Sequence, residues 1–235
     1  MGIKNNNRVL SALVILMAVV MVIPMLSSCG KENAASLTGL NTQLNIINVG
    51  PDTYPLDLFI ALRQQNTKHY TYANPSGYIY LASLATPLQI RNYKNETIFS
   101  KDTALRVNTR YSIFITGLLS DNTRTTIFVT DTDSAPGLGR GKLRFINASA
   151  RTVNVDIYAN GTLAFKNQGF KAVTTYQELP AGIYDLKVCQ ANTTTVLTDL
   201  PKTTIQDGRL YTLYTKGVVG RTDSAAFGSA MIINR

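Results

Sequence analysis

The fold of this chain is decided by a stretch that occurs twice: Leu44-Asn-Ile-Ile-Asn-Val-Gly-Pro-Asp-Thr-Tyr-Pro-Leu-Asp-Leu-Phe59 and, about 99 residues later, Leu143-Arg-Phe-Ile-Asn-Ala-Ser-Ala-Arg-Thr-Val-Asn-Val-Asp-Ile-Tyr158. The two align without a gap. They share Leu44/Leu143, Ile47/Ile146, Asn48/Asn147, Thr53/Thr152 and Asp57/Asp156. A second pair, Arg110-Tyr-Ser-Ile-Phe-Ile-Thr-Gly117 and Leu210-Tyr-Thr-Leu-Tyr-Thr-Lys-Gly217, follows at a similar spacing. Self-similarity at one period indicates a duplicated structural unit, so two copies of one domain are predicted.

Both units have the pattern of short strands. In Leu56-Asp-Leu-Phe-Ile60 and Val155-Asp-Ile-Tyr-Ala159 the aliphatic residues fall at every second position, which is the period of a sheet with one buried face. Asn160-Gly161 predicts a type I′ hairpin turn, and Leu179-Pro-Ala-Gly182 and Asp207-Gly208 predict further turns. Turns about every ten residues favour an all-β chain of two tandem antiparallel β-sandwich domains, immunoglobulin- or prealbumin-like.

The N-terminus has the pattern of a lipoprotein signal peptide. Lys4 and Arg8 precede an apolar run over residues 9–23, Pro24 interrupts it, and Leu26-Ser-Ser-Cys29 follows. The last four residues resemble a bacterial lipobox, which implies cleavage between Ser28 and Cys29 and acylation of Cys29 by lipid such as palmitate. The alternative is an uncleaved apolar anchor over residues 9–26.

The expected organisation places a Gly- and Pro-rich linker between the two units. Its sequence is Ser134-Ala-Pro-Gly-Leu-Gly-Arg-Gly141. The chain is then a signal peptide (1–28), a lipid-anchored tether (29–42), sandwich repeat 1 (43–135), the linker (136–141) and sandwich repeat 2 (142–235). Lys31-Glu32, directly after the acylated cysteine and Gly30, also resembles a surface-export signal. The periplasmic and the surface-facing leaflets of the outer membrane are therefore both alternatives for the anchor.

The charge is positive but dispersed. The net charge of the full sequence is +9, and removal of residues 1–28, which hold Lys4 and Arg8, lowers it by two, to about +7. No basic run or nucleic-acid-binding motif occurs, which disfavours a nucleic-acid partner. With Cys29 acylated, Cys189 has no partner for a disulfide and is expected to be a packed thiol.

The second unit also carries a resemblance. Val155-Asp-Ile-Tyr158, Tyr176 ahead of Leu179-Pro-Ala-Gly-Ile-Tyr184, and Leu210-Tyr-Thr-Leu-Tyr214 resemble the domain-of-unknown-function 4397 family. In the first unit, Ala85-Thr86-Pro87 stands where the family has its Pro-Ala-Gly turn. The resemblance implies secreted or lipid-anchored bacterial proteins built of tandem sandwiches. It implies no activity and no catalytic residue.

Residues that could support an enzyme are few. His69 is the only histidine, and neither a phosphate loop, a dinucleotide fingerprint nor a nucleophile elbow is present. Asp57 and Asp156, one in each copy, fit hydrogen bonding within strands or turns better than catalysis. Asp131-Thr-Asp133-Ser134 begins like a calcium loop but lacks the later ligands. No enzyme activity, cofactor or metal is therefore predicted.

Two surface features are candidate sites. Tyr70, Tyr72, Tyr78 and Tyr80 are predicted to form an aromatic binding strip on two strands joined by a Pro-Gly turn, with ordinary core packing as the alternative. Three Asp-Ser/Thr-Ala triplets resemble O-glycosylation acceptors, which makes Thr103, Ser134 and Ser224 candidates, with plain polar turns as the alternative.

These patterns predict a lipid-anchored protein of the outer membrane or cell surface with a non-enzymatic binding or scaffold role. The membrane is contacted through the N-terminal lipid, and the expected partner is a glycan or an envelope protein. The alternative is an accessory glycan-binding surface lipoprotein of an uptake system, with the tyrosine strip as its site.

Overall fold

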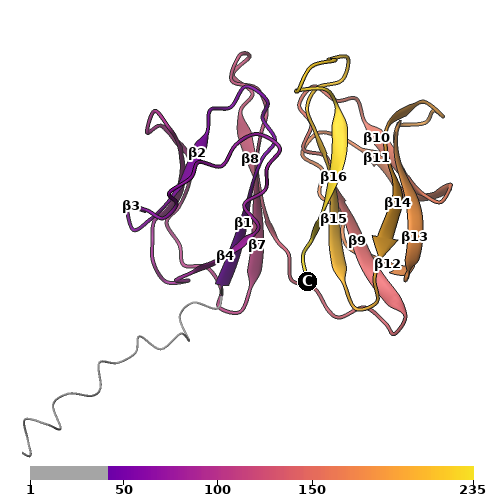
Figure 1. Ribbon diagram of the computed structural model, residues 1–235, viewed down its shortest axis with the longest axis horizontal. Helices are drawn as coiled ribbons and strands as arrows, with labels where there is room; N and C mark the ends of the chain where they lie inside the picture. The colour runs from indigo at the N-terminus through magenta and orange to yellow at the C-terminus, as the bar shows by residue number, and fades with distance from the viewer. Residues whose placement is uncertain (1–41) are drawn as a thin grey trace, which may run out of the picture. The chain divides into compact units, whose positions relative to one another are not determined.

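The computed structural model describes residues 42–235, which fall within one compact unit. These residues form sixteen strands arranged as two tandem groups of two sheets (Figure 1), so the predicted all-β fold is confirmed. No helix in this range is long and apolar enough to cross a membrane. The expected signal peptide, with Ser28 and Cys29, lies outside the described residues, as does the tether except for its last residue.

The first sandwich contains sheets A and B. Sheet A has the order β4-β1-β7-β8 and sheet B the order β3-β2-β5-β6. The strands are β1 (Thr42–Asn48), β2 (Leu56–Ile60), β3 (Arg63–Gln64), β4 (Tyr78–Leu81), β5 (Leu88–Asn92), β6 (Thr97–Lys101), β7 (Arg110–Thr116) and β8 (Thr125–Thr130).

The second sandwich repeats this topology with sheets C and D. Sheet C has the order β12-β9-β15-β16 and sheet D the order β11-β10-β13-β14. The strands are β9 (Arg140–Ile146), β10 (Val155–Ala159), β11 (Thr162–Gln168), β12 (Gln177–Pro180), β13 (Gly182–Gln190), β14 (Val196–Ile205), β15 (Leu210–Lys216) and β16 (Gly228–Ile233). The sequence repeat is thus a repeat of strand order.

Each sandwich departs in one place from purely antiparallel pairing. β1 pairs with β7 in parallel, and β9 pairs with β15 in parallel. The two quoted sequence repeats supply the strands of these pairs, since Leu44 lies opposite Tyr111 and Leu143 opposite Tyr211. The duplicated motif therefore builds the centre of sheets A and C.

The backbone shows one predicted turn and one pair of matching glycines in the two repeats. Asn160 and Gly161 both have positive φ, 48° and 77°, between paired residues Ala159 and Thr162, as a type I′ hairpin requires. Gly117 has φ 83°, and a Cβ there would lie 2.1 Å from the Thr123 carbonyl oxygen. Its repeat counterpart Gly217 has the same constraint, which explains why a glycine follows β7 and β15 in both units.

Each sandwich has its own apolar core between its two sheets. The first is built around Leu44, Ile46, Leu58, Ile90 and Ile113, all fully buried. The second is built around Leu143, Phe145, Ile157, Val188 and Leu213, also fully buried. Alternate residues of the same strands must then face away from these cores.

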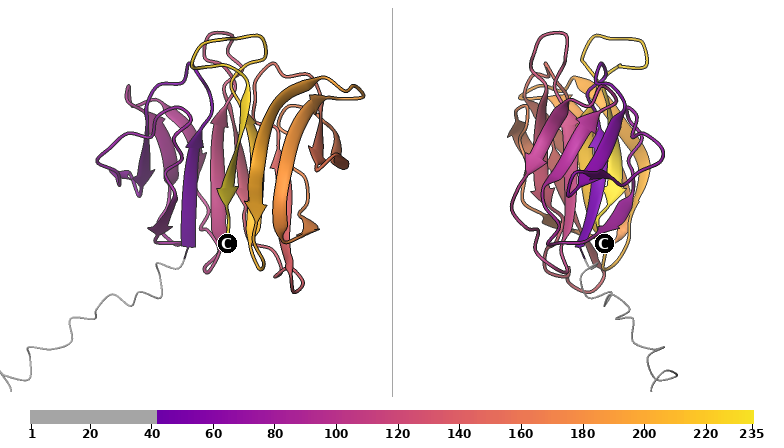
Figure 2. Two further views of the ribbon diagram at one scale, coloured as in Figure 1. Left: turned by 45° about the vertical axis from the view of Figure 1, so that its right-hand side comes forward. Right: turned by 90° about the vertical axis from the view of Figure 1, so that its left-hand side faces the viewer.

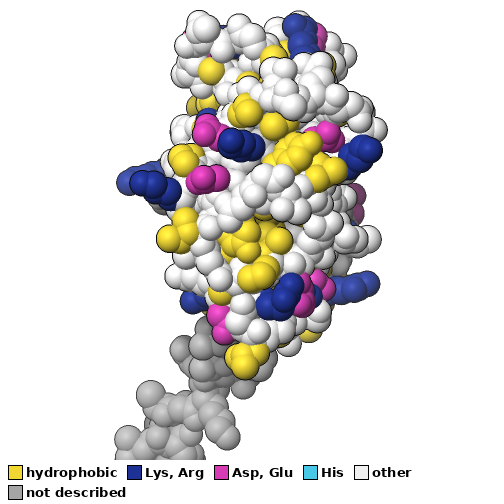
Figure 3. All heavy atoms as spheres, turned by 90° about the vertical axis from the view of Figure 1, so that its right-hand side faces the viewer, with side chains coloured by type: hydrophobic (Ala, Val, Ile, Leu, Met, Phe, Trp, Pro, Cys, Tyr) yellow, Lys and Arg dark blue, Asp and Glu magenta, His cyan; other side chains and the backbone are white. Residues whose placement is uncertain are grey.

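Sheets A and C are covered on their other faces as well, because they pack against each other (Figures 1 and 2). All seven residues of β1 are buried for this reason. We call this contact the seam. Sheets B and D are the outer sheets, and Figure 3 views the molecule from the side of the second sandwich, on which hydrophobic side chains lie among charged ones.

Candidate functional site

The seam has an apolar centre. The cluster consists of buried residues from both sandwiches: Ile47, Val49, Phe114, Ile127, Ile146, Ala148 and Tyr214. The rings of Phe114 and Tyr214 meet edge to face, with their centroids 5.2 Å apart. Burial raises the pKa of Tyr214 to about 12. Burial of this apolar surface favours the joined arrangement of the two sandwiches.

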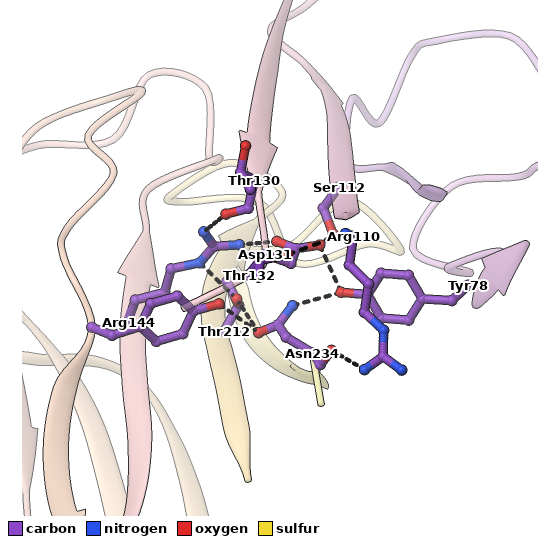
Figure 4. A network of polar contacts seen from close by, with 10 residues as sticks. Tyr78, Arg110, Ser112, Thr130, Asp131, Thr132, Arg144, Thr212 and Asn234 are labelled. Carbon is purple, nitrogen blue, oxygen red and sulfur yellow. Dashed lines mark hydrogen bonds and ion pairs between the residues drawn. The ribbon is translucent and has the colours of Figure 1, made fainter. Parts of the chain in front are cut away.

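A buried ion pair crosses the seam beside this cluster (Figure 4). Asp131, directly after β8, accepts from the guanidinium of Arg144 on β9. The side chains are 0% and 4% exposed, respectively. Arg144 also donates to the Thr130 carbonyl at 2.8 Å and to the Thr212 hydroxyl at 2.9 Å. The guanidinium therefore bonds to both sandwiches at once.

The other carboxylate oxygen of Asp131 is occupied by its own sandwich. The hydroxyls of Tyr78 and Ser112 each donate to Oδ2 at 2.6 Å. Burial and the neighbouring Asp131 carboxylate raise the pKa of Tyr78, so its hydroxyl stays a donor. With both oxygens engaged, Asp131 holds partners in place and has no oxygen left without a hydrogen bond.

Asn234, just after β16, connects the same groups from the second sandwich (Figure 4). Its amide nitrogen donates to the Tyr78 hydroxyl at 2.8 Å, and its side-chain oxygen accepts from the Thr212 hydroxyl at 2.6 Å. Its backbone carbonyl accepts from Arg110 of β7 at 2.6 Å. Residues 131, 144 and 234 and the groups they bond form what we call the seam network.

An aromatic ring covers the seam network. Tyr176 lies beneath the Arg144 guanidinium, with 4.9 Å between the Arg144 Cζ and the ring centroid, a cation–π contact. Its hydroxyl donates to the Asn234 side-chain oxygen at 3.2 Å. Burial raises the pKa of Tyr176 to about 12. The charged pair is thus enclosed by hydrogen bonds and an aromatic face, as a buried ion pair requires.

The residues between the sandwiches continue this pattern of paired charges. Lys142 donates to the Asp133 carboxylate at 2.9 Å and to the Ser134 hydroxyl at 2.7 Å. The hydrogen bond from Lys142 holds the pKa of Asp133 below its usual value. Asp131 and Asp133, the two carboxylates that resembled a calcium loop, therefore each pair with a basic side chain. Among residues 42–235 no cluster of three or more His, Cys, Asp or Glu side chains is placed to hold a metal ion.

A small cavity opens beside the seam network. It has a volume of about 270 Å³ and is lined by residues of both sandwiches, namely Asn108, Arg110, Asp131, Thr132, Asp133, Leu210, Asn234 and Arg235. Asp131 and Asp133 belong to the ion pairs already described, and Arg110 donates to the Asn234 carbonyl. The cavity is therefore a polar recess at one end of the seam.

The four tyrosines of the predicted strip occupy different environments. Tyr70 packs against the core of the first sandwich, and Tyr78 belongs to the seam network. The buried Tyr72 hydroxyl has no hydrogen-bond partner among residues 42–235, and of the four rings Tyr80, 67% exposed, projects into solvent. The predicted hairpin within residues 70–80 is wrong: β4 pairs with β1, while Tyr70 and Tyr72 bridge to Leu56 and Asn48. Ligand binding by these rings stays a prediction.

The remaining candidate residues do not belong to the seam network. Thr103, Ser134 and Ser224 are all exposed, and their glycosylation stays a prediction. Asp57 accepts from His69 at 2.8 Å and from Asn66 at 2.6 Å.

The repeat counterpart of Asp57 is likewise bonded within its own sandwich. Asp156 accepts from the backbone N–H groups of Asn167 and Asn192. Cys189 is buried, and burial raises the pKa of its thiol.

The comparisons with known proteins concern the duplicated unit. A family model described as a domain of unknown function (DUF4397) matches residues 42–156 and 141–228. No curated protein matches the chain. A leucine-rich repeat protein from Bacteroides thetaiotaomicron VPI-5482 is similar at 11% identity over 77% of this chain and 26% of that one, with a TM-score of 0.18.

The TIE protein of Bacillus anthracis is similar at 14% identity, over 81% of this chain and 43% of that one, with a TM-score of 0.21. This chain thus spans less than half the length of either solved chain. The family match, in contrast, covers nearly all of the described residues and falls on both sequence repeats. The chain therefore belongs to the DUF4397 family, as two tandem copies of its domain.

Proposed function

We propose that the protein is a lipid-anchored, non-enzymatic scaffold of the outer membrane or cell surface, whose two sandwiches act as one rigid body. The observation that carries the proposal is the seam network. A buried ion pair tolerates little displacement, because separating the partners leaves a charge without compensation in a dry environment. Asp131 and Arg144 therefore favour one relative orientation of the two sandwiches.

A fixed orientation suits a protein that presents surfaces to partners. Sheets A and C face each other across the seam, so sheets B and D, the loops and exposed edge positions such as Tyr80 remain to meet an envelope protein or a glycan. The lipobox at Cys29 supports attachment to the membrane, since two or three acyl chains anchor a protein firmly.

Anchoring is tested by fatty-acid labelling in the native host. Cys29→Ser is expected to abolish incorporation and to leave the precursor uncleaved, because a hydroxyl does not replace the thiol that accepts the lipid. Cys189→Ser, at the chain's other cysteine, is the matched control and is expected to keep full labelling. Labelling that survives Cys29→Ser contradicts the anchoring proposal.

A second candidate function is accessory glycan binding for an uptake system. The observation that favours it is the set of exposed aromatic rings on the first sandwich, Tyr80 at 67% and Tyr93 at 53% exposure. Tyrosine rings commonly stack on sugars and order at low entropic cost.

A further inference from the structure

The outer face of sheet B carries an arginine held in one orientation. Arg91 on β5 lies with its Cζ 4.4 Å above the centroid of the Phe59 ring on β2. Its Nε and one terminal nitrogen donate to the Gln89 side-chain oxygen at 3.1 and 2.6 Å, and the other terminal nitrogen donates to Asn95 at 2.9 Å. Since a guanidinium has five N–H donors, two remain for a ligand.

Arg91 lies next to a pair of tyrosines at the β5–β6 turn, because it donates to Asn95, which belongs to that turn. Tyr93, 53% exposed, meets Tyr54 edge to face at 5.0 Å between centroids. The Lys94 ammonium lies 4.3 Å from the Tyr54 ring centroid and donates to the Tyr54 hydroxyl at 3.0 Å. Figure 2, right, views the molecule from the side that carries sheet B.

The acidic groups beside this surface are already engaged. Asp57 lies beneath it, 7% exposed, and accepts from His69 and Asn66. Glu96, whose side chain is 54% exposed, accepts from the Asn92 amide at 2.7 Å and lies 3.8 Å from the Arg124 guanidinium. The groups left to meet a ligand are therefore a guanidinium with two N–H donors, an exposed ammonium and an exposed tyrosine ring.

The duplication shows that these groups are not needed for the fold. Asp57 lies opposite Arg91 in sheet B, whereas its counterpart Asp156 lies opposite Cys189 in sheet D. The corresponding β13–β14 turn, Ala191-Asn-Thr193, has no aromatic residue. The second sandwich builds the same topology without the arginine or the tyrosine. In sheet D, Ile183 and Val196 are exposed. Figure 3 shows hydrophobic side chains among charged ones on the side of the second sandwich.

We propose that the outer face of sheet B and the β5–β6 turn bind an acidic polysaccharide, with Arg91 and Lys94 contacting its carboxylates and Tyr93 stacking on a sugar ring. A planar guanidinium recognises a carboxylate through two parallel hydrogen bonds, and the apolar face of a sugar packs on an aromatic ring. The positive net charge of the chain adds long-range attraction for such a polymer. The proposal rests on the binding role proposed above and names its ligand class.

The test is calorimetric titration of the full-length protein in detergent with polygalacturonate, at about 0.15 M salt so that diffuse attraction is screened. Arg91→Lys keeps the positive charge but loses the planar pair of N–H donors of the guanidinium, and it is expected to weaken binding about tenfold. Tyr93→Ala is expected to weaken it about fivefold through lost stacking. The matched control is Arg209→Lys, at an exposed arginine of the second sandwich, and it is expected to stay within about twofold.

Three outcomes overturn the proposal: no saturable binding of polygalacturonate, equal weakening by the site and control variants, or site-dependent binding only to phosphatidylglycerol vesicles. Tyr93→Ala keeps the test decisive if Arg91→Lys lowers the melting temperature. Since the titration does not depend on acylation of Cys29, its failure is distinguishable from failure of the anchoring proposal.

Discussion

Arg144→Met is the substitution that examines the seam most sharply. Methionine fills much of the space of the arginine stem but supplies no positive charge or hydrogen-bond donor. The Asp131 carboxylate, 0% exposed, would keep its two hydroxyl donors and lose its only cation. Removing one partner of a buried ion pair costs about 3–5 kcal/mol, because the remaining charge is left uncompensated. For a chain of this size that corresponds to a fall in Tm of roughly 6–20 °C.

The double variant Arg144→Met/Asp131→Asn distinguishes the effect of breaking the ion pair from nonspecific destabilisation of the fold. Replacing both charges leaves no uncompensated carboxylate. We therefore expect the double variant to lose less unfolding free energy than the losses of Arg144→Met and Asp131→Asn added together, by about 2 kcal/mol or more. Arg140→Met is the matched control, since Arg140 and Glu178 pair at 3.3 Å with side chains 45% and 38% exposed. It is expected to cost no more than about 1 kcal/mol.

The assay is urea unfolding of the full-length protein in mild detergent, followed by far-UV circular dichroism. The unfolding free energies of the parent protein, Arg144→Met, Asp131→Asn and the double variant give the coupling energy between positions 131 and 144 directly. The reasoning is refuted if Arg144→Met is no more destabilising than Arg140→Met, or if the effects of the two seam substitutions simply add.

Two further predictions concern tyrosines. Burial raises the folded-state pKa of Tyr176 and Tyr214 to about 12 from an ordinary value of 10, so the stability they contribute is full below pH 10 and is lost as the pH rises from 10 to 12. The free energy of unfolding in urea should fall over that range, by up to about 2.7 kcal/mol per tyrosine, and Tyr176→Phe and Tyr214→Phe should flatten the fall. A free energy of unfolding that is unchanged up to about pH 11.5 would count against their burial. Tyr78→Ala should lower the free energy of unfolding by about 3–5 kcal/mol and Tyr80→Ala by no more than about 0.5 kcal/mol, because only the former loses buried contacts. Melting curves that coincide would contradict the placement of Tyr78.

The duplicated framework is the part of this fold that local sequence patterns reveal. Period-2 alternation in residues 56–60 and 155–159, the Asn160-Gly161 turn and the paired Gly117 and Gly217 each depend on neighbours a few residues away. Such features predict strands and turns, and the repeat predicts that they occur twice. The parallel pairing of β1 with β7 joins residues about 67 apart, which no local pattern reveals.

The seam is the part that alternation alone misplaces. Arg144 lies between Leu143 and Phe145, so a two-residue period puts it on a nominal solvent face. The available signal was the adjacent apolar pairs Ile46-Ile47 and Phe145-Ile146, which are typical of strands buried on both faces. They indicate that a second layer covers the strand. They do not indicate that Asp131, Tyr78 and Asn234 would meet the arginine there.

The surface around Arg91 was missed for a related reason. Phe59, Arg91 and Tyr93 come together because β2 pairs with β5 and because Asn95 ties the turn to the sheet face. The predicted strip over residues 70–80 depends on two strands joined by a Pro-Gly turn, whereas the exposure of each ring depends on the strand pairing and on the face that the ring takes. Comparison of the two repeats, position by position, is the sequence signal that separates Arg91 from the shared framework.

The central claim is that the two sandwiches form one rigid body, and an electron–electron distance measurement tests it most directly. Spin labels at Thr97→Cys on β6 and Thr204→Cys on β14, both exposed, report on the separation of sheets B and D in a background without Cys29 and Cys189. Labels at Thr97→Cys and Tyr80→Cys, both within the first sandwich, give the width expected of a rigid pair. We predict a single distance distribution between the sandwiches as narrow as that control. A distribution that is broad or has several maxima, while the control stays narrow, would contradict the account.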